Sequence, residues 1–407
     1  TARGGDMTLS GFSAIATLRD VPAGRVEPPN ADYADRFNRY GGAGYWRNIN
    51  MTADFPSAAT AIERLYEEVT GTAVDGTIAA DPFALEAMLG VVGEVRVPRI
   101  GETVDAGSVV PFVTNEAYSR FRSPAVRKRL LGDVAGTVFE RFLASPGGPL
   151  GFRALADAAA AGHLLMHSTD PREQRGLETA GVSGALGPAT GDYLAVVGNN
   201  AAGNKADFYA DRAIRYEVRL GAEGTGVGHA TVEITNDAPK QGEPRYVIGP
   251  YSGEFDAGEN VTLLDLYCGR ECGVEEFRID GGRATVGSEE ELGHRVYPVR
   301  ISIPSGATRV LDYGYQVPTA WAGDDVAGTY TLTFRGQTTI RPAALVVDVR
   351  APEGMEIVAA SPGMEWSGGR AVWRGSAPDL ETFEVRFERP PLERIWHFLS
   401  RPVFRLG

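Results

Sequence analysis

The periodicity of apolar residues changes near residue 213, and this change constrains the fold more than any other feature of the chain. Beyond it, short runs such as RYEVRLG, HATVEITN and GTYTLTFRGQ alternate apolar and polar residues, and turn clusters such as NDAP and PSGA separate them. Alternation with a period of two is typical of strands that bury one face. Many short strands with no helix between them predict a β-sandwich, here over residues 213–388.

Residues 1–212 instead alternate helical and strand patterns. Between Pro56 and Thr70 the apolar residues recur at helical spacing, and Gly71 follows as a natural stop. The strand-like runs VDGTIAAD and GEVRVPRIG flank the helical run PFALEAMLGVV. Strands that alternate with helices predict an α/β domain in which helices cover a sheet. Further helices are expected at 108–120, 124–144 and 150–161, and further strands at 163–169 and 192–198.

The last segment, residues 389–407, begins at a Pro-Pro break and mixes apolar with basic residues. It predicts an amphipathic tail that lies either on the parent domain or on a membrane. The chain has no apolar run of about 18 residues, the length that spans a bilayer, and it begins without a methionine or a signal peptide. We therefore expect the α/β domain to be incomplete at its start, with any anchor helix upstream of Thr1.

The chain has two cysteines, Cys268 and Cys272, which lie in the glycine-containing turn LYCGRECG. A zinc site would need more ligands, and the five histidines are scattered singly. The spacing favours a small disulfide loop over two free thiols. A disulfide would place the protein in an oxidising, extracytoplasmic compartment.

A run of positive charge between Ala117 and Arg129 departs from the acidic average of a chain whose formal net charge is −13. Guanidinium groups are planar forks that suit phosphate oxygens, so the run predicts a site for a phosphate-bearing anion. The alternative is an ordinary solvated helix face. The overall acidity argues against a nucleic-acid partner. The candidate ligand-binding arginines are Arg120, Arg122, Arg127 and Arg129.

Polar residues also gather in three other segments. An Arg-Asp pair, such as Arg19 with Asp20, can bind an anion and a divalent metal together, or form a surface ion pair. Asp54 precedes a predicted helix, where it either caps the helix or binds a metal. The block NNAAGNKADFYADR is either a binding edge or a structured linker. The remaining candidate ligand-binding residues are Arg47 before Asp54, and Lys205 and Arg212 in that block.

Several of these segments resemble known families. The run DGTIAADPFALEAMLGVVGEVRVP, the pair AYSRFR and RSPAVRKR, and LSGFSAIATLRD are similar to the LytR-CpsA-Psr pattern over roughly residues 5–145. One glycine of that pattern is missing at Val92, and its first acidic segment would precede Thr1. The chain more closely resembles an actinobacterial family of unknown function, numbered four thousand and twelve, through NINMTADFPSAA, VDGTIAADP, NNAAGNKADFYADR and the LYC turn.

LytR-CpsA-Psr proteins are anchored outside the cytoplasmic membrane and move anionic glycopolymers from a polyprenyl pyrophosphate carrier to peptidoglycan, with magnesium. The resemblance implies a LytR-CpsA-Psr-like fold for the α/β domain. It also implies that the arginines of the basic run bind pyrophosphate, with Arg120 and Arg122 in a catalytic role, and that Arg19 assists. Asp20 would bind Mg²⁺ and take part in catalysis, with Asp54 as a second metal ligand.

The expected function is therefore that of an envelope protein that binds a polyprenyl-pyrophosphate-linked glycan or cell-wall polymer. It would reach the membrane through an anchor outside this chain. Such a protein either transfers the polymer, as a phosphotransferase, or only binds and assembles it through the β-sandwich. An apolar tunnel lined by residues such as Leu85 and Met88 and ending at the arginines would favour transfer. A closed core with solvated arginines would favour binding.

Overall fold

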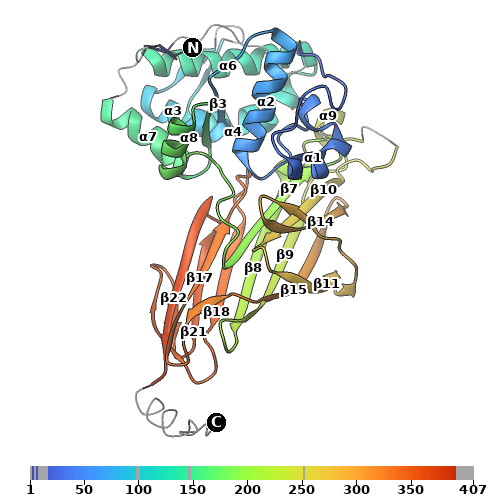
Figure 1. The fold of residues 1–407 in the computed structure, drawn as a ribbon. Helices are drawn as coiled ribbons and strands as arrows, with labels where there is room; N and C mark the ends of the chain where they lie inside the picture. Colours follow the sequence, from blue (N-terminus) through green and yellow to red (C-terminus); the bar gives the residue numbers. More distant parts are fainter. Residues whose placement is uncertain are drawn as a thin grey trace, which may run out of the picture. The chain divides into compact units, whose positions relative to one another are not determined.

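The computed structural model describes residues 2–3, 6–7, 17–97, 101–144, 148–250 and 253–390. The chain divides into two compact units, coloured by sequence in Figure 1. The helical unit comprises Thr1–Gly187, Ala202–Phe208 and Pro239–Gly258, and the sandwich unit comprises Pro188–Ala201, Tyr209–Ala238 and Glu259–Gly407. The predicted amphipathic tail lies outside the described residues, apart from its first two residues.

Three helices of the helical unit begin where the sequence supplies an aspartate cap. Asp54, Asp81 and Asp170 each accept hydrogen bonds from backbone N–H groups of the first turn, and a proline follows in that turn. An aspartate cap satisfies N–H groups that have no partner inside the helix. These helices are α2 (Phe55–Thr70), α3 (Pro82–Val92) and α8 (Pro171–Thr179).

The basic run lies on a longer helical stretch of the same unit. The stretch runs through α4 (Ala106–Pro111), the π-helical turn η4 (Phe112–Glu116) and α5 (Ala117–Arg120). After a three-residue break, α6 (Pro124–Ala144) follows. The remaining helices described in this unit are α1 (Ala31–Phe37), η2 (Asn38–Tyr40), η3 (Gly42–Gly44), α7 (Gly148–Ala160), η5 (Ala206–Tyr209, apart from its last residue) and α9 (Arg245–Ile248).

The strands described in the helical unit pair only two by two and antiparallel. The pairs are β1 (Ala2–Arg3) with β2 (Asp6–Met7), β3 (Gly76–Ala80) with β6 (Leu164–Ser168), and β4 (Val95–Val97) with β5 (Glu102–Val104). The coarse prediction of helices mixed with strands is confirmed, but the described strands do not form one sheet covered by helices. They are short, and Ile78 in β3 is 64% exposed, so this pair has no face buried along its length.

The apolar helix α3 is buried in a core of this unit rather than beside an open slot. Met88 and Leu89 are buried, and Leu85, Val91 and Val92 pack against the same cluster. That cluster also contains Val138 and Phe142 of α6. Among the described residues, no helix is long and apolar enough to cross a membrane.

The sandwich unit consists of antiparallel and parallel strands in two large sheets, as far as the structure describes it. The first sheet has the order β13 (Glu289–Glu291), β14 (His294–Ile303), β10 (Asn260–Cys268), β7 (Asp192–Asn200), β17 (Ala327–Arg335), β22 (Leu380–Glu388), β19 (Glu356–Ala360), with β16 (Trp321–Gly323) also on β17. The second has the order β12 (Gly282–Arg283), β11 (Gly273–Ile279), β15 (Ala307–Val317), β9 (Gly226–Asn236), β8 (Ala210–Leu220), β18 (Ala344–Arg350), β21 (Arg370–Ser376), β20 (Glu365–Ser367).

One apolar core fills the space between these sheets. Leu264 and Leu332 of the first sheet share a buried cluster with Val232 and Val347 of the second. Two sheets that share one core form a sandwich, so the β-rich prediction for the second half is confirmed. Within each sheet, strands from the two halves of the unit meet in a parallel pair, β7 with β17 and β8 with β18.

The expected boundary at residue 212 differs from the observed units. Strand β7, expected in the α/β domain, belongs to the sandwich unit, while residues 202–208 and 239–258 return to the helical unit. The first six residues of β7 are buried without alternation because the strand lies inside its sheet, between β10 and β17. Continuous burial is also typical of parallel strands in α/β folds, which explains the different expectation.

Candidate functional site

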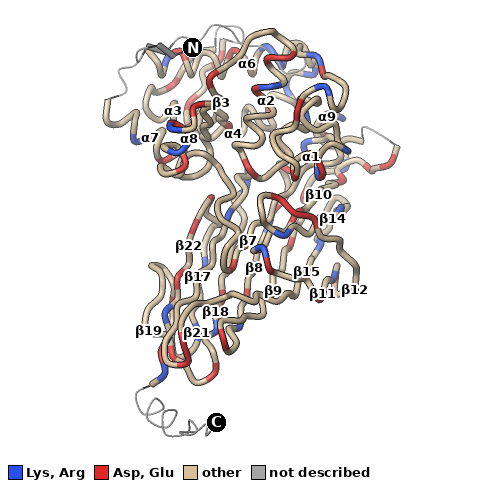
Figure 2. Tube along the Cα trace, in the orientation of Figure 1, with Lys and Arg blue, Asp and Glu red and all other residues tan. Residues whose placement is uncertain are grey.

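The basic run is divided between two helices and the break that separates them. Arg120 is the last residue of α5, Arg122 lies in the break, and Arg127 and Arg129 lie in α6. Arg122 and Arg129 are exposed, whereas Arg127 is only 3% exposed. The run therefore contains one buried guanidinium among solvated ones. In Figure 2, basic and acidic residues are otherwise interspersed along both units.

The buried guanidinium lies against two tyrosine rings. Its Cζ atom is 4.7 Å from the ring centroid of Tyr118 and 4.5 Å from that of Tyr246. The two rings are stacked, with centroids 5.3 Å apart and an interplanar angle of 6°. Lys205 Nζ lies 5.5 Å from the centroid of the Tyr118 ring. We call these four residues, Tyr118, Arg127, Lys205 and Tyr246, the tyrosine–arginine cluster.

Separate chain segments bring this cluster together within the helical unit. Tyr118 belongs to α5, Arg127 to α6 and Tyr246 to α9, and Lys205 lies in the returning segment 202–208. The Lys205 N–H donates to the Val247 carbonyl at 2.8 Å, which fixes that segment against α9. Lys205 was a sequence candidate. Tyr246 was missed, because nothing in the run RYVIG marks its ring as part of a cationic site.

The cluster has two positive charges and no carboxylate ion pair among the described residues. Arg127 donates from Nη1 to the Phe121 carbonyl at 3.0 Å, and its guanidinium lies over the two tyrosine rings. The nearby Glu243 accepts from the Ser119 hydroxyl at 2.6 Å. Ring faces attract a cation by roughly 0.5–2 kcal/mol each, but they do not neutralise it. A buried, uncompensated guanidinium favours an external anion.

Arg120 has a different environment. It forms an ion pair with Glu102, and its guanidinium lies over the rings of Phe112 and Phe121. The hydrogen bond that Arg120 donates to the Glu102 carboxylate raises the pKa of Arg120 above its ordinary value. Arg120 is therefore already neutralised within the protein, and less available for a ligand than Arg122 or Arg129.

The Arg19–Asp20 segment and Arg47 lie around the indole of Trp46. The Asp20 carboxylate accepts from the Trp46 backbone N–H at 3.0 Å, and the Trp46 indole donates to the Arg19 carbonyl at 3.0 Å. Arg47 is exposed, and its guanidinium lies 3.5 Å from the Tyr45 hydroxyl. These contacts hold the loop before α2 in place.

Asp54 is the cap of α2. One carboxylate oxygen accepts from the Ser57 N–H at 2.9 Å and from the Ser57 hydroxyl at 2.7 Å, and the other accepts from the Leu186 N–H at 3.1 Å. No group of three or more His, Cys, Asp or Glu side chains converges as a metal site within the described ranges. Asp20 and Asp54 therefore do not fit a magnesium site as they stand, and their assignment to a metal stays a hypothesis.

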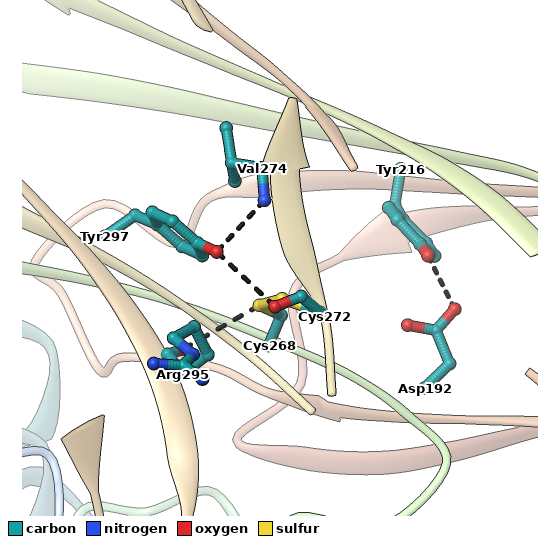
Figure 3. Close-up of a disulfide and its surroundings, with 7 residues drawn as sticks. All are labelled: Asp192, Tyr216, Cys268, Cys272, Val274, Arg295 and Tyr297. Atoms are coloured by element: carbon teal, nitrogen blue, oxygen red, sulfur yellow. Dashed lines mark hydrogen bonds between the residues drawn. A yellow bond between two sulfur atoms is a disulfide. The ribbon is translucent and has the colours of Figure 1, made fainter. Parts of the chain in front are cut away.

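The remaining candidates belong to the sandwich unit. Arg212 lies in β8 and is not part of the tyrosine–arginine cluster. Cys268 and Cys272 form a disulfide, as predicted. Figure 3 shows the Tyr297 hydroxyl beside it, accepting from the Val274 N–H at 3.0 Å and donating to the Cys272 carbonyl at 3.4 Å.

Cavities lie elsewhere. One of about 440 Å³ is lined by residues of α2, β6 and α8 in the helical unit, including His167. Another, of about 1180 Å³, lies at the end of the sandwich, where Arg219, Arg350 and Trp321 line it. Neither is lined by the arginines of the basic run. Sequence reasoning missed both, because each is built from segments distant in the chain.

Comparisons with known proteins give one family match. Residues 1–118 match the family described as "Protein of unknown function (DUF4012)". The match ends at Tyr118, so Arg127, Lys205 and Tyr246 lie beyond it. No curated protein matches the chain.

Solved structures show only weak likenesses. A provisionally named nutrient-binding protein from Legionella pneumophila is 8% identical with a TM-score of 0.28, covering 49% of this chain and 71% of that one. An M1 zinc metallopeptidase from Deinococcus radiodurans is 13% identical with a TM-score of 0.24, covering 44% of this chain and 42% of that one. Leukotriene A4 hydrolase from Saccharomyces cerevisiae is 10% identical with a TM-score of 0.26, covering 43% and 29%. The chain thus spans less than half of the last two proteins, and likenesses this weak carry no argument about it.

Proposed function

We propose that this chain is an extracytoplasmic cell-envelope protein that binds a polyprenyl-pyrophosphate-linked glycopolymer at the tyrosine–arginine cluster. The observation that carries the proposal is Arg127, a buried guanidinium with no carboxylate partner among the described residues. An arginine keeps its charge at any physiological pH. A bound pyrophosphate would supply the missing negative charge.

The surroundings of Arg127 suit a phosphate group. Arg122, Lys128 and Arg129 are exposed around the first turn of α6, where backbone N–H groups at the helix start also favour an anion. Lys205 adds a flexible cation, with its Nζ 5.5 Å from the centroid of the Tyr118 ring. In the proposed complex Arg122 and Lys205 donate to phosphate oxygens. Arg127 packs against the two tyrosine rings and adds a positive charge close to the phosphate.

Two features favour binding and assembly over transfer. The apolar residues of α3 that would line a lipid tunnel are packed in a core with α6. The aspartates that would hold magnesium accept structural hydrogen bonds. The proposal therefore takes no catalytic step through a metal. Polymer transfer, with Arg120, Arg122 and Asp20 in catalytic roles, remains the second candidate through the LytR-CpsA-Psr resemblance.

The disulfide supports the extracytoplasmic compartment that we propose for this protein. Cysteine pairs persist in oxidising compartments and are rare in the cytosol, and Cys268 and Cys272 are joined. The proposed membrane attachment is an anchor outside this chain. The sandwich unit is proposed to hold the polymer or a protein partner of the envelope.

Calorimetric titration with farnesyl pyrophosphate tests the site. Arg122→Ala should weaken binding by about 1.5–3 kcal/mol, the range for a hydrogen bond to a charged group. Arg122→Lys should recover only part of this loss, because lysine keeps the charge without the fork. The matched control is Arg153→Ala, which removes an exposed helical arginine whose nearest acid is Asp157 at 3.8 Å.

Each outcome decides the proposal. If Arg122→Ala binds as tightly as the wild type, the basic run is an ordinary solvated face. If Arg153→Ala weakens binding equally, the protein attracts pyrophosphate only through its overall charge. If Arg122→Lys binds as well as arginine, the contribution is diffuse charge, and specific pyrophosphate recognition is excluded.

A further inference from the structure

The cavity of about 440 Å³ in the helical unit is a second place where a ligand could bind. Its size falls within the ~300–1,000 Å³ typical of small-molecule sites. Glu63, Arg64 and Glu67 of α2 line it, together with His167 of β6 and the apolar side chain of Val74. None of these residues belongs to the tyrosine–arginine cluster, so the two sites can be tested separately.

A buried histidine–glutamate pair forms part of the wall. His167 Nδ1 lies 2.8 Å from Glu63 Oε1, and the Thr77 hydroxyl donates to the same oxygen at 2.8 Å. The side chains of His167 and Glu63 are 10% and 9% exposed. Because a carboxylate accepts hydrogen bonds, a neutral His167 ring carries its proton on Nδ1. The other ring nitrogen, Nε2, is then a hydrogen-bond acceptor held in a fixed orientation.

That acceptor faces no protein donor in the described residues. No hydrogen bond from the described residues reaches His167 Nε2. A buried polar atom without a partner would be a defect of the fold, and this nitrogen is not one of those atoms. It is therefore open to solvent, and the residue lines the cavity. The Glu63 carboxylate fixes the ring by its far side and leaves Nε2 available to a ligand hydroxyl.

The chain contains a matched pair with a structural role. His163 Nδ1 lies 2.7 Å from Asp81 Oδ2, and Asp81 also caps α3. The His163 ring stacks on Phe83 with centroids 4.6 Å apart, and it does not line the cavity. The same carboxylate–imidazole contact thus occurs twice. At His163 the ring is packed against Phe83, and at His167 the ring lines a cavity large enough for a ligand.

The charges of the cavity indicate what it would hold. Glu63 and Glu67 contribute two carboxylates against the single guanidinium of Arg64, so a strongly anionic ligand is disfavoured. Arg64 donates from Nη1 to the carbonyls of Glu27 and Pro28, and the same nitrogen lies 3.9 Å from the Glu27 carboxylate. Within the described residues its Nη2 and Nε donate no hydrogen bond, so they can serve a ligand. The wall thus offers acceptors at His167 and Glu67, donors at Arg64, and an apolar surface at Val74.

We propose that this cavity binds one neutral sugar residue. Each sugar hydroxyl can both donate and accept, so adjacent hydroxyls can donate to His167 Nε2 and to the Glu67 carboxylate while one accepts from Arg64. The C–H face of the ring packs on Val74. The ligand is a neutral, monosaccharide-sized polyol, free or as one unit of a glycan.

Two-dimensional NMR of the histidine ring signals in the full chain tests this site. Methyl glucoside and methyl galactoside should shift the His167 signal in a saturable manner and leave the His163 signal in place. His167→Gln should weaken binding of the better glycoside about tenfold, the effect of one lost hydrogen bond. His163→Gln should bind it as the wild type does.

A second variant guards against misfolding. Val74→Trp fills the cavity from a loop without touching the histidine pair, and it should abolish binding while the His167 signal keeps its wild-type position. If neither glycoside moves the His167 signal, or if His163 shifts along with it, the site is excluded. If glycerol shifts His167 as strongly as the glycosides, or glucose 1-phosphate binds more tightly than methyl glucoside, the assignment to a neutral sugar is overturned.

Discussion

Each unit buries one charged side chain among tyrosines, but the two use the tyrosines in opposite ways. In the helical unit, Arg127 lies against the ring faces of Tyr118 and Tyr246. In the sandwich unit, Asp192 at the start of β7 is 1% exposed and accepts from the hydroxyls of Tyr216 at 2.5 Å and Tyr330 at 2.6 Å (Figure 3 shows the Tyr216 bond). The face of a tyrosine ring attracts a cation, whereas the tyrosine hydroxyl donates a hydrogen bond to an anion.

The two charges differ in how they can be neutralised. Both tyrosine bonds reach the same oxygen of Asp192, and its Oδ1 is buried without a partner in the described residues. Burial raises the pKa of Asp192 to about 6, so a proton can neutralise it near physiological pH. Arg127 has no such alternative, because guanidinium does not lose its proton. A proton can therefore neutralise the buried acid within its own unit, whereas the proposed ligand would supply the counter-charge of the buried base.

The largest expected effect is the pH dependence that Asp192 confers. Its folded-state pKa lies above the unfolded value near 3.9, so the folded state holds the proton more tightly and stability falls as pH rises from about 4 to 6. A shift of about two units corresponds to about 3 kcal/mol. Asp192→Asn should remove this loss, as measured by urea unfolding of the β-sheet signal from pH 4 to 7.5.

The control for that series is Glu381→Gln, which removes an exposed carboxylate of β22. It should keep the wild-type pH profile. If Asp192→Asn keeps that profile as well, Asp192 is charged in the folded state at all these pH values, and the contrast with Arg127 is lost.

Removing one hydroxyl from the Asp192 site has the next largest effect. Tyr330→Phe should destabilise the sandwich by about 1.5–3 kcal/mol at pH 7.5, where the hydrogen bond serves a charge, and by about 1 kcal/mol at pH 4, where it serves a neutral acid. Tyr216→Phe should behave in the same way. Equal losses at both pH values would mean that protonation of Asp192 does not control the site.

The opposite result is expected for Arg127. A buried charge without a carboxylate partner carries a desolvation cost that an apolar side chain of similar length does not, so Arg127→Met should change the free energy of unfolding by less than about 1 kcal/mol. Binding of farnesyl pyrophosphate should fall clearly in the same variant. A large loss of stability would make Arg127 a structural residue and remove the main support for the proposed function.

The smallest expected effect is on ligand binding, and it distinguishes the ring face of Tyr118 from its hydroxyl. Tyr118→Leu removes the aromatic ring that both Arg127 and Lys205 approach, and it should weaken farnesyl pyrophosphate binding by about 0.5–1 kcal/mol. Tyr118→Phe keeps the face and should bind as the wild type does. If the phenylalanine variant is the weaker one, the hydroxyl of Tyr118 contacts the ligand, and this cluster resembles the Asp192 site more than it contrasts with it.

The parts of the fold with a local sequence signal were predictable. The period of two predicted the strands of the sandwich, and helical spacing with an aspartate before a proline predicted α2 and α3. The disulfide was predictable because Cys268 and Cys272 share one turn. The strands β3, β4 and β6 lie in the predicted runs. Their pairing was not predicted, because the partner of a short strand is decided by distant packing.

The candidate site was predictable only in part. Charge marked Arg127 and Lys205, but nothing local shows that one guanidinium is buried and its neighbours are not. Tyr246 and the His167–Glu63 pair carry no sequence signal, since each depends on segments that meet only after folding. The segments 202–208 and 239–258 return to the helical unit from between sandwich strands, and no boundary drawn once along the chain could place them there.

These returning segments also set an order of events for a chain that leaves the ribosome or an export channel from its first residue. Tyr118 and Arg127 emerge early. Lys205 follows only after β7, and Tyr246 follows only after β8 and β9 as well. Until residue 258 has emerged, the guanidinium lacks one of its two rings. The proposed anion site therefore cannot mature on a nascent first unit alone. A fragment cut at Gly187 would keep helices α1 to α8 but would lack Lys205 and Tyr246 of the cluster.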